Sequence, residues 1–385
     1  HDIPVRIYAP VGAHKDLLPY LVRRLLENGA NSSFVHRLVD AKTPVEDLVL
    51  NPVQELQKYR VLTNDRIPLP AHIYGGERTN SRGLNTHVEA HLAPLLSRLG
   101  GWGDASWHGG PVINGTRVID GSRQEVRSPY DAAKSPGSVV WADKAQAGEA
   151  LAAAEAGFRE WNERPVAERA GYLERYADLL EKHMEELMAL CCREAGKTIQ
   201  DGIDEVREAV DFCRYYAIQG RARFGSPIAL PGPTGESNEL YMEGRGVFLC
   251  ISPWNFPLAI FTGQVMAALV AGNTVIAKPA EQASLVAFRA VELMLEAGFP
   301  PDVIQLLPGD GEELGGILTP DPRIAGIAFT GSTLVAHLLN RALAGRDGAI
   351  VPLIAETGGQ NAMIVDSSAL PEQVIRDVLQ SAFAS

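Results

Sequence analysis

The sequence is short of cysteine, of positive charge and of long apolar runs, and each shortage excludes a class of protein. Its 385 residues include only four cysteines, none at the spacing of a zinc site, so we expect reduced core thiols and no disulfide framework. The formal net charge of -12 does not support nucleic-acid binding, which requires a basic surface. No uninterrupted apolar stretch is long enough to span a bilayer.

The remaining composition is that of a globular protein. Apolar residues make up 46% and charged residues 21% of the chain, and its length suits roughly two or three domains. His1 is not an initiator residue, and the final segment PEQVIRDVLQSAFAS has a helical pattern without a cap. We therefore expect the chain to be an excerpt of a longer polypeptide.

The pattern of a strand, a helix and a second strand occupies residues 246–282. The apolar run Val247–Ile251 predicts a buried strand, and a helix rich in small residues is predicted from Leu258 to Ala271. The β-branched segment Thr274–Ala277 predicts the second strand. This order predicts a βαβ unit, and therefore a parallel sheet in an α/β fold.

Polar residues follow both of these strands. Asn255 comes after the first strand and Lys278 after the second. Ligands of open parallel sheets bind at the carboxyl ends of the strands. We therefore expect Asn255 and Lys278 to line one crevice.

Two later strands also end in polar turns. Ile324–Phe329 is followed by Thr330-Gly331-Ser332, which starts a helix, and Pro352–Ala355 leads to Glu356 in the segment ETGG. Amide groups at a helix N-terminus suit a pyrophosphate, although a serine there also serves as a simple helix cap. A loose glycine pattern, GxGxxxG, runs from Gly309 to Gly315 and is weak by itself.

Four motifs in this order, PWNFP, KPAEQ, FTGS and ETGG, resemble those of the aldehyde dehydrogenase superfamily. The resemblance implies a Rossmann-type parallel sheet, with Asn255 stabilising an oxyanion and Glu356 acting as the general base that activates water. It also implies that Lys278 and Glu281 bind ribose hydroxyls, where a carboxylate favours NAD over NADP. The residues that it assigns to NAD are Ile251, Ser252, Pro253, Trp254, Lys278, Glu281, Gly311, Phe329, Thr330, Gly331, Ser332 and Gly358. Without the other motifs, Asn255 would be interpreted as a residue that merely makes the turn between Pro253 and Pro257, and Lys278–Glu281 as an exposed ion pair.

The nucleophile of this chemistry is absent from the sequence. No cysteine follows Cys250, which lies inside a predicted strand and should pack in the sheet. In the family the catalytic cysteine comes shortly after the segment that ends here as QSAFAS. Because the thiolate is the nucleophile, we expect this chain alone not to oxidise aldehydes.

The first 40 residues resemble a different enzyme. The segments RIYAPVG and LLPYLVRRLLEN look like the last strand and helix of the (β/α)8 proline dehydrogenase barrel in the bifunctional proline utilization A family. The resemblance implies that Arg23 and Arg24 bind the carboxylate of proline, which two guanidinium groups suit, and that Tyr8 and Tyr20 form pocket walls. The local pattern alone favours a solvated basic edge, with Arg23 paired to Glu27. FAD would bind to strands upstream of this sequence.

The resemblance divides the chain into four regions. Residues 1–40 are the end of the barrel, 41–110 a connector, 111–245 the N-terminal hairpin and helices of the aldehyde dehydrogenase domain, and 246–385 its NAD-binding region. The connector is predicted to hold a single helix, Pro52–Tyr59. Its scattered histidines do not indicate a metal site.

Between the connector and the nucleotide-binding region we expect a flap, three helices and a crossing segment. Asn114-Gly115 and Asp120-Gly121 are hairpin dipeptides and predict an antiparallel flap. The charged residues of the helices are mostly assigned to the solvated face, although the family places those near Glu205 and Arg207 beside the aldehyde entrance. The predicted strands are Val112–Ile113, Arg117–Ile119, Gln124–Arg127 and Val139–Ala142, the helices Asp143–Phe158, Val166–Met188 and Asp201–Tyr216, and the crossing segment Ile228–Glu243.

The combined resemblance implies a function in proline catabolism. FAD would oxidise proline to pyrroline-5-carboxylate, which hydrolyses to glutamate semialdehyde, and NAD would oxidise the semialdehyde to glutamate. The family also implies substrate channelling, a homo-oligomer, and a cytoplasmic enzyme that reaches the inner face of the membrane to reduce quinone. The alternatives are a monofunctional NAD-dependent aldehyde dehydrogenase and a noncatalytic NAD-binding module.

Overall fold

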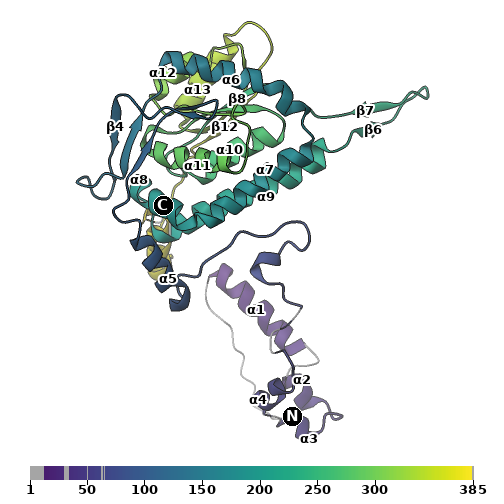
Figure 1. Ribbon diagram of the computed structural model, residues 1–385. Helices are drawn as coiled ribbons and strands as arrows, with labels where there is room; N and C mark the ends of the chain where they lie inside the picture. The colour runs from purple at the N-terminus through teal and green to yellow at the C-terminus, as the bar shows by residue number, and fades with distance from the viewer. Residues whose placement is uncertain (1–12, 30–33, 50, 62–63, 65, 384–385) are drawn as a thin grey trace. The chain divides into compact units, whose positions relative to one another are not determined.

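The computed structural model describes residues 13–29, 34–49, 51–61, 64 and 66–383, which form two compact units (Figure 1). The first unit ends at Pro68 and the second begins at Leu69. None of the described helices is both long and apolar enough to cross a membrane.

The described part of the first unit is helical. Its helices differ in length. They are α1 (His14–Gly29), α2 (Phe34–Val39), α3 (Val45–Leu48) and α4 (Pro52–Gln57). Helix α1 begins three residues before the predicted start at Leu17. Asn51 caps α4 by accepting a hydrogen bond from the amide of Val53 (2.9 Å), and Pro52 occupies the first position, where no amide is needed. The strand expected in the segment RIYAPVG lies outside the described residues.

The second unit is built on a seven-stranded sheet in which five neighbouring strands are parallel, so the predicted α/β class is confirmed. The strand order is β12-β11-β8-β9-β10-β2-β3. The parallel strands are β8 (Val247–Ile251), β9 (Thr274–Lys278), β10 (Ile304–Leu306), β11 (Ile324–Gly331) and β12 (Leu353–Thr357). The chain moves outward from β8 through β9 to β10 and then returns to the other side of β8, so the topological switch point lies between β8 and β11.

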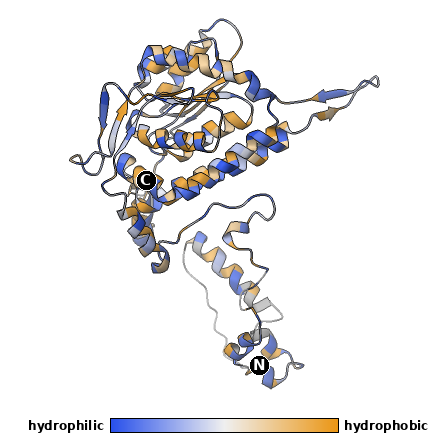
Figure 2. Ribbon diagram, viewed as in Figure 1, coloured by the Kyte–Doolittle hydropathy of each residue, from blue (hydrophilic) through white to orange (hydrophobic). Residues whose placement is uncertain are grey.

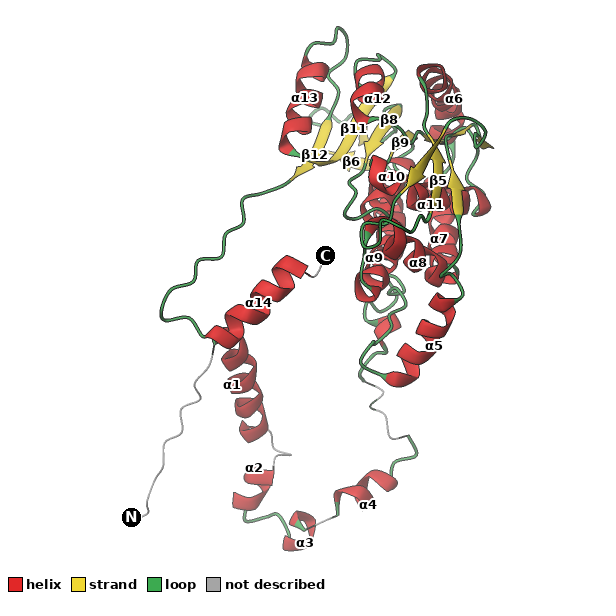
Figure 3. Cartoon of the chain, turned by 90° about the vertical axis from the view of Figure 1, so that its left-hand side faces the viewer, coloured by secondary structure: helices red, strands yellow, loops and turns green. Residues whose placement is uncertain are grey.

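Helices cover both faces of this sheet (Figures 1 and 3). Along β8, Phe248 and Cys250 belong to one apolar core, whereas Val247 and Leu249 belong to the other. Because both faces are buried, the strand is apolar throughout instead of alternating, and Figure 2 shows the central strands in the hydrophobic colour. One face carries α7 (Val166–Lys182), α8 (Met184–Ala195), α9 (Ile199–Phe224), α10 (Ala259–Val270) and α11 (Ser284–Glu296), and the other α6 (Lys144–Glu163), α12 (Gly311–Leu318) and α13 (Thr333–Ala344).

The predicted flap is partly wrong. Strands β2 (Val112–Ile113) and β3 (Thr116–Arg117) do form a hairpin, and Asn114 and Gly115 both have positive φ, as its two-residue turn requires. Strand β4 (Arg123–Val126), however, pairs with β5 (Gly137–Val140) in a separate sheet that β1 (Trp107–Gly109) completes. The dipeptide Asp120-Gly121 therefore does not join two paired strands.

Other elements also differ from the prediction, and α9 runs eight residues beyond its predicted end at Tyr216. The helix expected over Val166–Met188 breaks at His183, which ends α7 and precedes α8; its imidazole lies 3.3 Å from the carboxylate of Glu186 in the new first turn. The segment expected merely to cross the molecule forms a projecting hairpin of β6 (Ile228–Leu230) and β7 (Asn238–Leu240), visible in Figure 1. The connector contains α3, η1 (Pro70–His72) and α5 (Glu89–Gly100) besides its predicted helix.

The second half of the connector is fixed to the second unit by polar contacts. Asp211 on α9 accepts hydrogen bonds from the guanidinium of Arg78 (2.7 Å) and from the hydroxyl of Ser81 (2.6 Å). This explains why the first compact unit ends at Pro68. The last helix, α14 (Pro371–Phe383), has no buried residue.

Candidate active site

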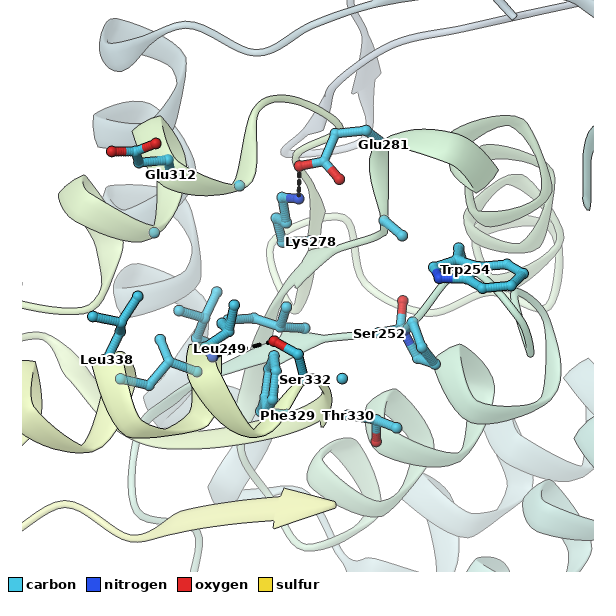
Figure 4. Close-up of a pocket in the computed structure, with 18 of the residues that line it drawn as sticks. Leu249, Ser252, Trp254, Lys278, Glu281, Glu312, Phe329, Thr330, Ser332 and Leu338 are labelled. Carbon is cyan, nitrogen blue, oxygen red and sulfur yellow. Dashed lines mark hydrogen bonds and ion pairs between the residues drawn. The ribbon is translucent and has the colours of Figure 1, made fainter. Parts of the chain in front are cut away.

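The carboxyl ends of the central strands border a crevice of about 1200 Å³ (Figure 4). Strand register places Lys278 beside Ile251, and Ile251 beside Phe329. Thr330 in turn pairs with Glu356 on β12. Every residue that the aldehyde dehydrogenase resemblance assigned to catalysis or to NAD lines this crevice.

Asn255 lies in the loop between β8 and α10. It is exposed, and its carboxamide makes no hydrogen bond with any described residue. A residue whose purpose is to stabilise the turn would bond the neighbouring backbone. The carboxamide is therefore available to a ligand in the crevice.

Buried or capping acids occupy the N-termini of three of the helices at this edge. Glu205 accepts hydrogen bonds from the first amides of α10, Glu194 does so for α11, and Asp310 caps α12 through the amide of Glu313 (2.8 Å). Helix α13 differs, because it begins after Ser332 and has no acidic residue in its first turn. Since amide groups at a helix N-terminus attract anions, α13 offers the most favourable of these four termini for a phosphate.

Two side chains at the start of α13 are held in place. Ser332 Oγ accepts a hydrogen bond from the amide of Val335 (3.2 Å), so the serine is a helix cap, whatever else it binds. Thr330 Oγ1 accepts one from Gln264 Nε2 (3.0 Å). A Cβ at Gly331 would lie 2.7 Å from the ring of Phe329, so only glycine fits there without a shift of that ring.

Lys278 and Glu281 form an ion pair, with 2.8 Å between Nζ and Oε1 (Figure 4). The Lys278 side chain is only 7% exposed, so this is not a solvent-exposed pair. Gly311 lies directly against it: a Cβ there would be 2.9 Å from Glu281 Oε1 and 3.2 Å from Lys278 Nζ. The glycine keeps the backbone of α12 close to a carboxylate that can accept hydrogen bonds from ribose hydroxyls.

None of the four cysteines is suited to be a nucleophile. Cys250 packs in the sheet, where burial raises the pKa of its thiol far above the ordinary range. Burial, with a smaller contribution from Asp201, raises the pKa of Cys192 to about 11. Cys191 and Cys213 are also buried with raised pKa values, and no cysteine lines the crevice. A reactive cysteine requires the opposite shift.

The residues expected to bind proline lie on α1. Arg23 and Arg24 are exposed, and the guanidinium of Arg24 lies 5.3 Å from the ring centre of Tyr20. Tyr8 and the side chain of Glu27 lie outside the described residues. The structure therefore brings together three of the four residues assigned to this site on a single helix.

Sequence reasoning missed several residues around the crevice. Gln264 bonds both Thr330 and the carbonyl of Ile251 (3.2 Å), and so joins β8 and β11 across the switch point. A lone glutamine in the apolar segment AIFTGQVMAALV was its only signal. The assignment of charges to the solvated face was wrong for Glu194, which is 2% exposed; Glu205, whose role was left open, is 1% exposed.

Two family models match this chain. The model of the aldehyde dehydrogenase family matches residues 118–385, and that of proline dehydrogenase matches residues 1–37. The two matches together include every candidate site residue and the helix that carries the arginine pair.

Known proteins resemble the chain over nearly its whole length. The bifunctional protein PutA of Klebsiella aerogenes is 50% identical over 391 residues, which cover 99% of this chain but only 29% of that protein. A solved structure of proline utilization A with proline bound in remote sites is 51% identical, with a TM-score of 0.78 over 99% of this chain and 36% of the other. The 1-pyrroline-5-carboxylate dehydrogenase from Thermus with bound NAD is 35% identical, with a TM-score of 0.74 over 80% of this chain and 61% of the other.

Proposed function

The chain belongs to the aldehyde dehydrogenase family, and from this membership we propose that it provides the NAD-binding half of a glutamate-semialdehyde dehydrogenase within a proline-catabolising enzyme. The observation that carries the proposal is the crevice at the switch point, where Asn255, Glu356 and the Lys278–Glu281 pair line one cavity. The matches to PutA proteins and to a 1-pyrroline-5-carboxylate dehydrogenase support the choice of substrate.

The crevice suits NAD by the chemistry of its lining. The amides at the start of α13 would hold the pyrophosphate, and Lys278 and Glu281 would bind the ribose hydroxyls. A 2′-phosphate would meet the carboxylate of Glu281, which favours NAD over NADP. When bound, NAD accepts a hydride from the substrate.

The residues of this chain would then act on charge and on protons. Attack of a thiolate on the aldehyde places negative charge on the carbonyl oxygen, and the carboxamide of Asn255 donates a hydrogen bond to that oxygen. Glu356 accepts a proton from the water that releases the acid product. Because the four cysteines are buried or have raised pKa values, the thiolate comes from outside this sequence.

The proline-oxidising half of the proposal rests on α1. Arg23 and Arg24 would bind the carboxylate of proline through paired hydrogen bonds, with Tyr8 and Tyr20 beside it. As the resemblance to the proline dehydrogenase barrel implies, FAD would bind to strands outside this sequence. We further propose a homo-oligomer on the cytoplasmic side of the membrane that transfers flavin electrons to quinone.

The experiment that tests the proposal is NAD-dependent oxidation of pyrroline-5-carboxylate by the protein at the length its gene encodes. We expect activity there, and NAD binding without activity in the 385-residue chain. Activity on other aldehydes but not on this substrate would favour a monofunctional aldehyde dehydrogenase. Absence of activity in both the protein at the length its gene encodes and the 385-residue chain, with NAD binding retained, would favour a noncatalytic module.

A further inference from the structure

A buried carboxylate lies directly behind the loop that carries Asn255. Glu205, on α9, is 1% exposed, and its Oε2 accepts hydrogen bonds from the amides of Leu258 (3.1 Å) and Ala259 (2.9 Å). These amides begin α10, three and four residues after Asn255. An acid at a helix N-terminus satisfies orphan amides and complements the helix dipole.

A buried cation completes this arrangement. Lys197 is 6% exposed, and its Nζ lies 3.3 Å from Glu205 Oε1 and 4.1 Å from the ring centre of Phe256, the residue after Asn255. The pair therefore contacts the loop at two points: an aromatic ring next to Asn255, and the amides that end the loop. Both contacts come from α9 and the turn before it, which are anchored in the helical layer.

Capping a helix with a buried ion pair carries a large desolvation penalty, because two charges are removed from water. Well-packed apolar residues often stabilise a fold as much as a buried ion pair does. A serine cap is a simpler alternative, as at α13, where Ser332 accepts a hydrogen bond from the amide of Val335. The pair instead restrains the loop that carries Asn255 from two directions.

We propose that Glu205 and Lys197 are positioning residues that hold the Asn255 loop so that its carboxamide is preorganised for the oxyanion. This inference rests on the role of Asn255 given under Proposed function. Preorganised donors account for much of the rate enhancement in oxyanion chemistry, and an error of about 1 Å in position can cost about 100-fold in rate.

The chain contains a matched control. Glu194 has the same chemistry one helix earlier: it is buried, and its two oxygens accept hydrogen bonds from the amides of Leu285 (2.8 Å) and Val286 (2.7 Å) at the start of α11. That helix follows Glu281, on the ribose side of the crevice. Loss of Glu194 should therefore disturb the binding of NAD, whereas loss of Glu205 should disturb the chemical step.

The test uses full-length enzyme with pyrroline-5-carboxylate and NAD. We expect Glu205→Gln to lower kcat by about 10- to 100-fold while the Kd for NAD stays within about twofold. Glu194→Gln should show the reverse pattern, with a raised Kd and a smaller change in kcat. Equal effects of both variants on kcat and Kd would reveal a purely structural role and overturn the inference.

A double-mutant cycle separates the inference from the function on which it rests. Asn255→Ala should lower kcat by about 100- to 1000-fold. If Glu205 acts through Asn255, adding Glu205→Gln to this variant should cause little further loss. Additive losses would overturn the positioning role alone, whereas an Asn255→Ala variant with normal kcat would overturn the proposed function and this inference together.

A double variant keeps the inference testable if Glu205→Gln alone fails to fold. Lys197→Met with Glu205→Gln removes both charges, so neither is left buried and alone. Hydrogen exchange should then be faster at the amides of Leu258 and Ala259 but unchanged at Leu285 and Val286. Unchanged exchange at Leu258 and Ala259 would show that the pair does not hold the loop, and would overturn the inference.

Discussion

Gly311 lies so close to Glu281 that a Cβ on the glycine would be 2.9 Å from the carboxylate oxygen. Gly311→Ala must therefore displace either the start of α12 or the Lys278–Glu281 pair. We expect NAD binding to weaken about tenfold, which corresponds to about 1.4 kcal/mol, as measured by titration calorimetry.

Gly316→Ala is the matched control for that substitution. Gly316 lies on the same helix and also lines the crevice, but nothing lies within 4 Å of the position of its Cβ. We expect this variant to bind NAD normally and to be slightly stabilised, because alanine suits a helix better than glycine. Equal weakening by both substitutions would show that α12 tolerates no side chain and that the ion pair is irrelevant.

The carboxylate of Glu281 should determine which dinucleotide binds. It would lie beside the ribose hydroxyls, where a 2′-phosphate would meet like charge. We expect Glu281→Gln to shift the ratio of the Kd values for NADP and NAD about tenfold toward NADP. Glu312→Gln removes another acid from the same crevice, and its ratio should stay unchanged; a similar shift in both variants would mean that only the overall charge of the crevice matters.

The features that could be predicted from the sequence are those fixed by local pattern. The unbroken apolar run Val247–Ile251 indicated a strand buried on both faces, and the two cores on either side of it bear this out. Asn114-Gly115 indicated its hairpin, because both residues adopt the positive φ that the turn requires. Residues following strand ends share the crevice because parallel strands all end at one edge.

The features that could not be predicted depend on partners distant in sequence. Helical periodicity assigned most charges of these helices to a solvated face and left the role of Glu205 open. Only the packing of α8 and α9 beneath α11 and α10 places Glu194 and Glu205 at helix N-termini. The dipeptide Asp120-Gly121 could turn the chain but could not specify that β4 would pair with β5. Nothing in the composition near His183 marks the break between α7 and α8.

The cysteines should be inert to alkylation in the folded chain. A pKa of about 11 for Cys192, against an ordinary value of 9.0, lowers its thiolate fraction at neutral pH about 100-fold. The other three are buried. We expect iodoacetamide to label the native chain about 100-fold more slowly than the urea-unfolded chain, by mass spectrometry, with NAD binding preserved. Rapid labelling that abolishes NAD binding would identify a reactive thiol in the crevice.

Glu194 should make stability depend on pH. Burial raises the pKa of its carboxyl to about 8 from an ordinary 4.5, although the amides of Leu285 and Val286 oppose the shift. The native state therefore retains a proton that the unfolded state releases, so stability from this group is present below about pH 4.5 and is lost as the pH rises to about 8.

Glu194→Gln removes this titration, so the difference in the free energy of unfolding between the wild type and the variant should change with pH. Relative to the variant, the wild-type free energy of unfolding in urea should fall between about pH 5 and about pH 8, because each pH unit in this window costs up to about 1.4 kcal/mol. Glu312→Gln, at an exposed acid, should follow the wild type at both pH values. A constant difference between wild type and Glu194→Gln would mean that Glu194 titrates alike in both states. Its oxygens would then receive enough stabilisation from the two amides of α11 to offset the cost of burial, and the carboxylate would be ionised in the native protein.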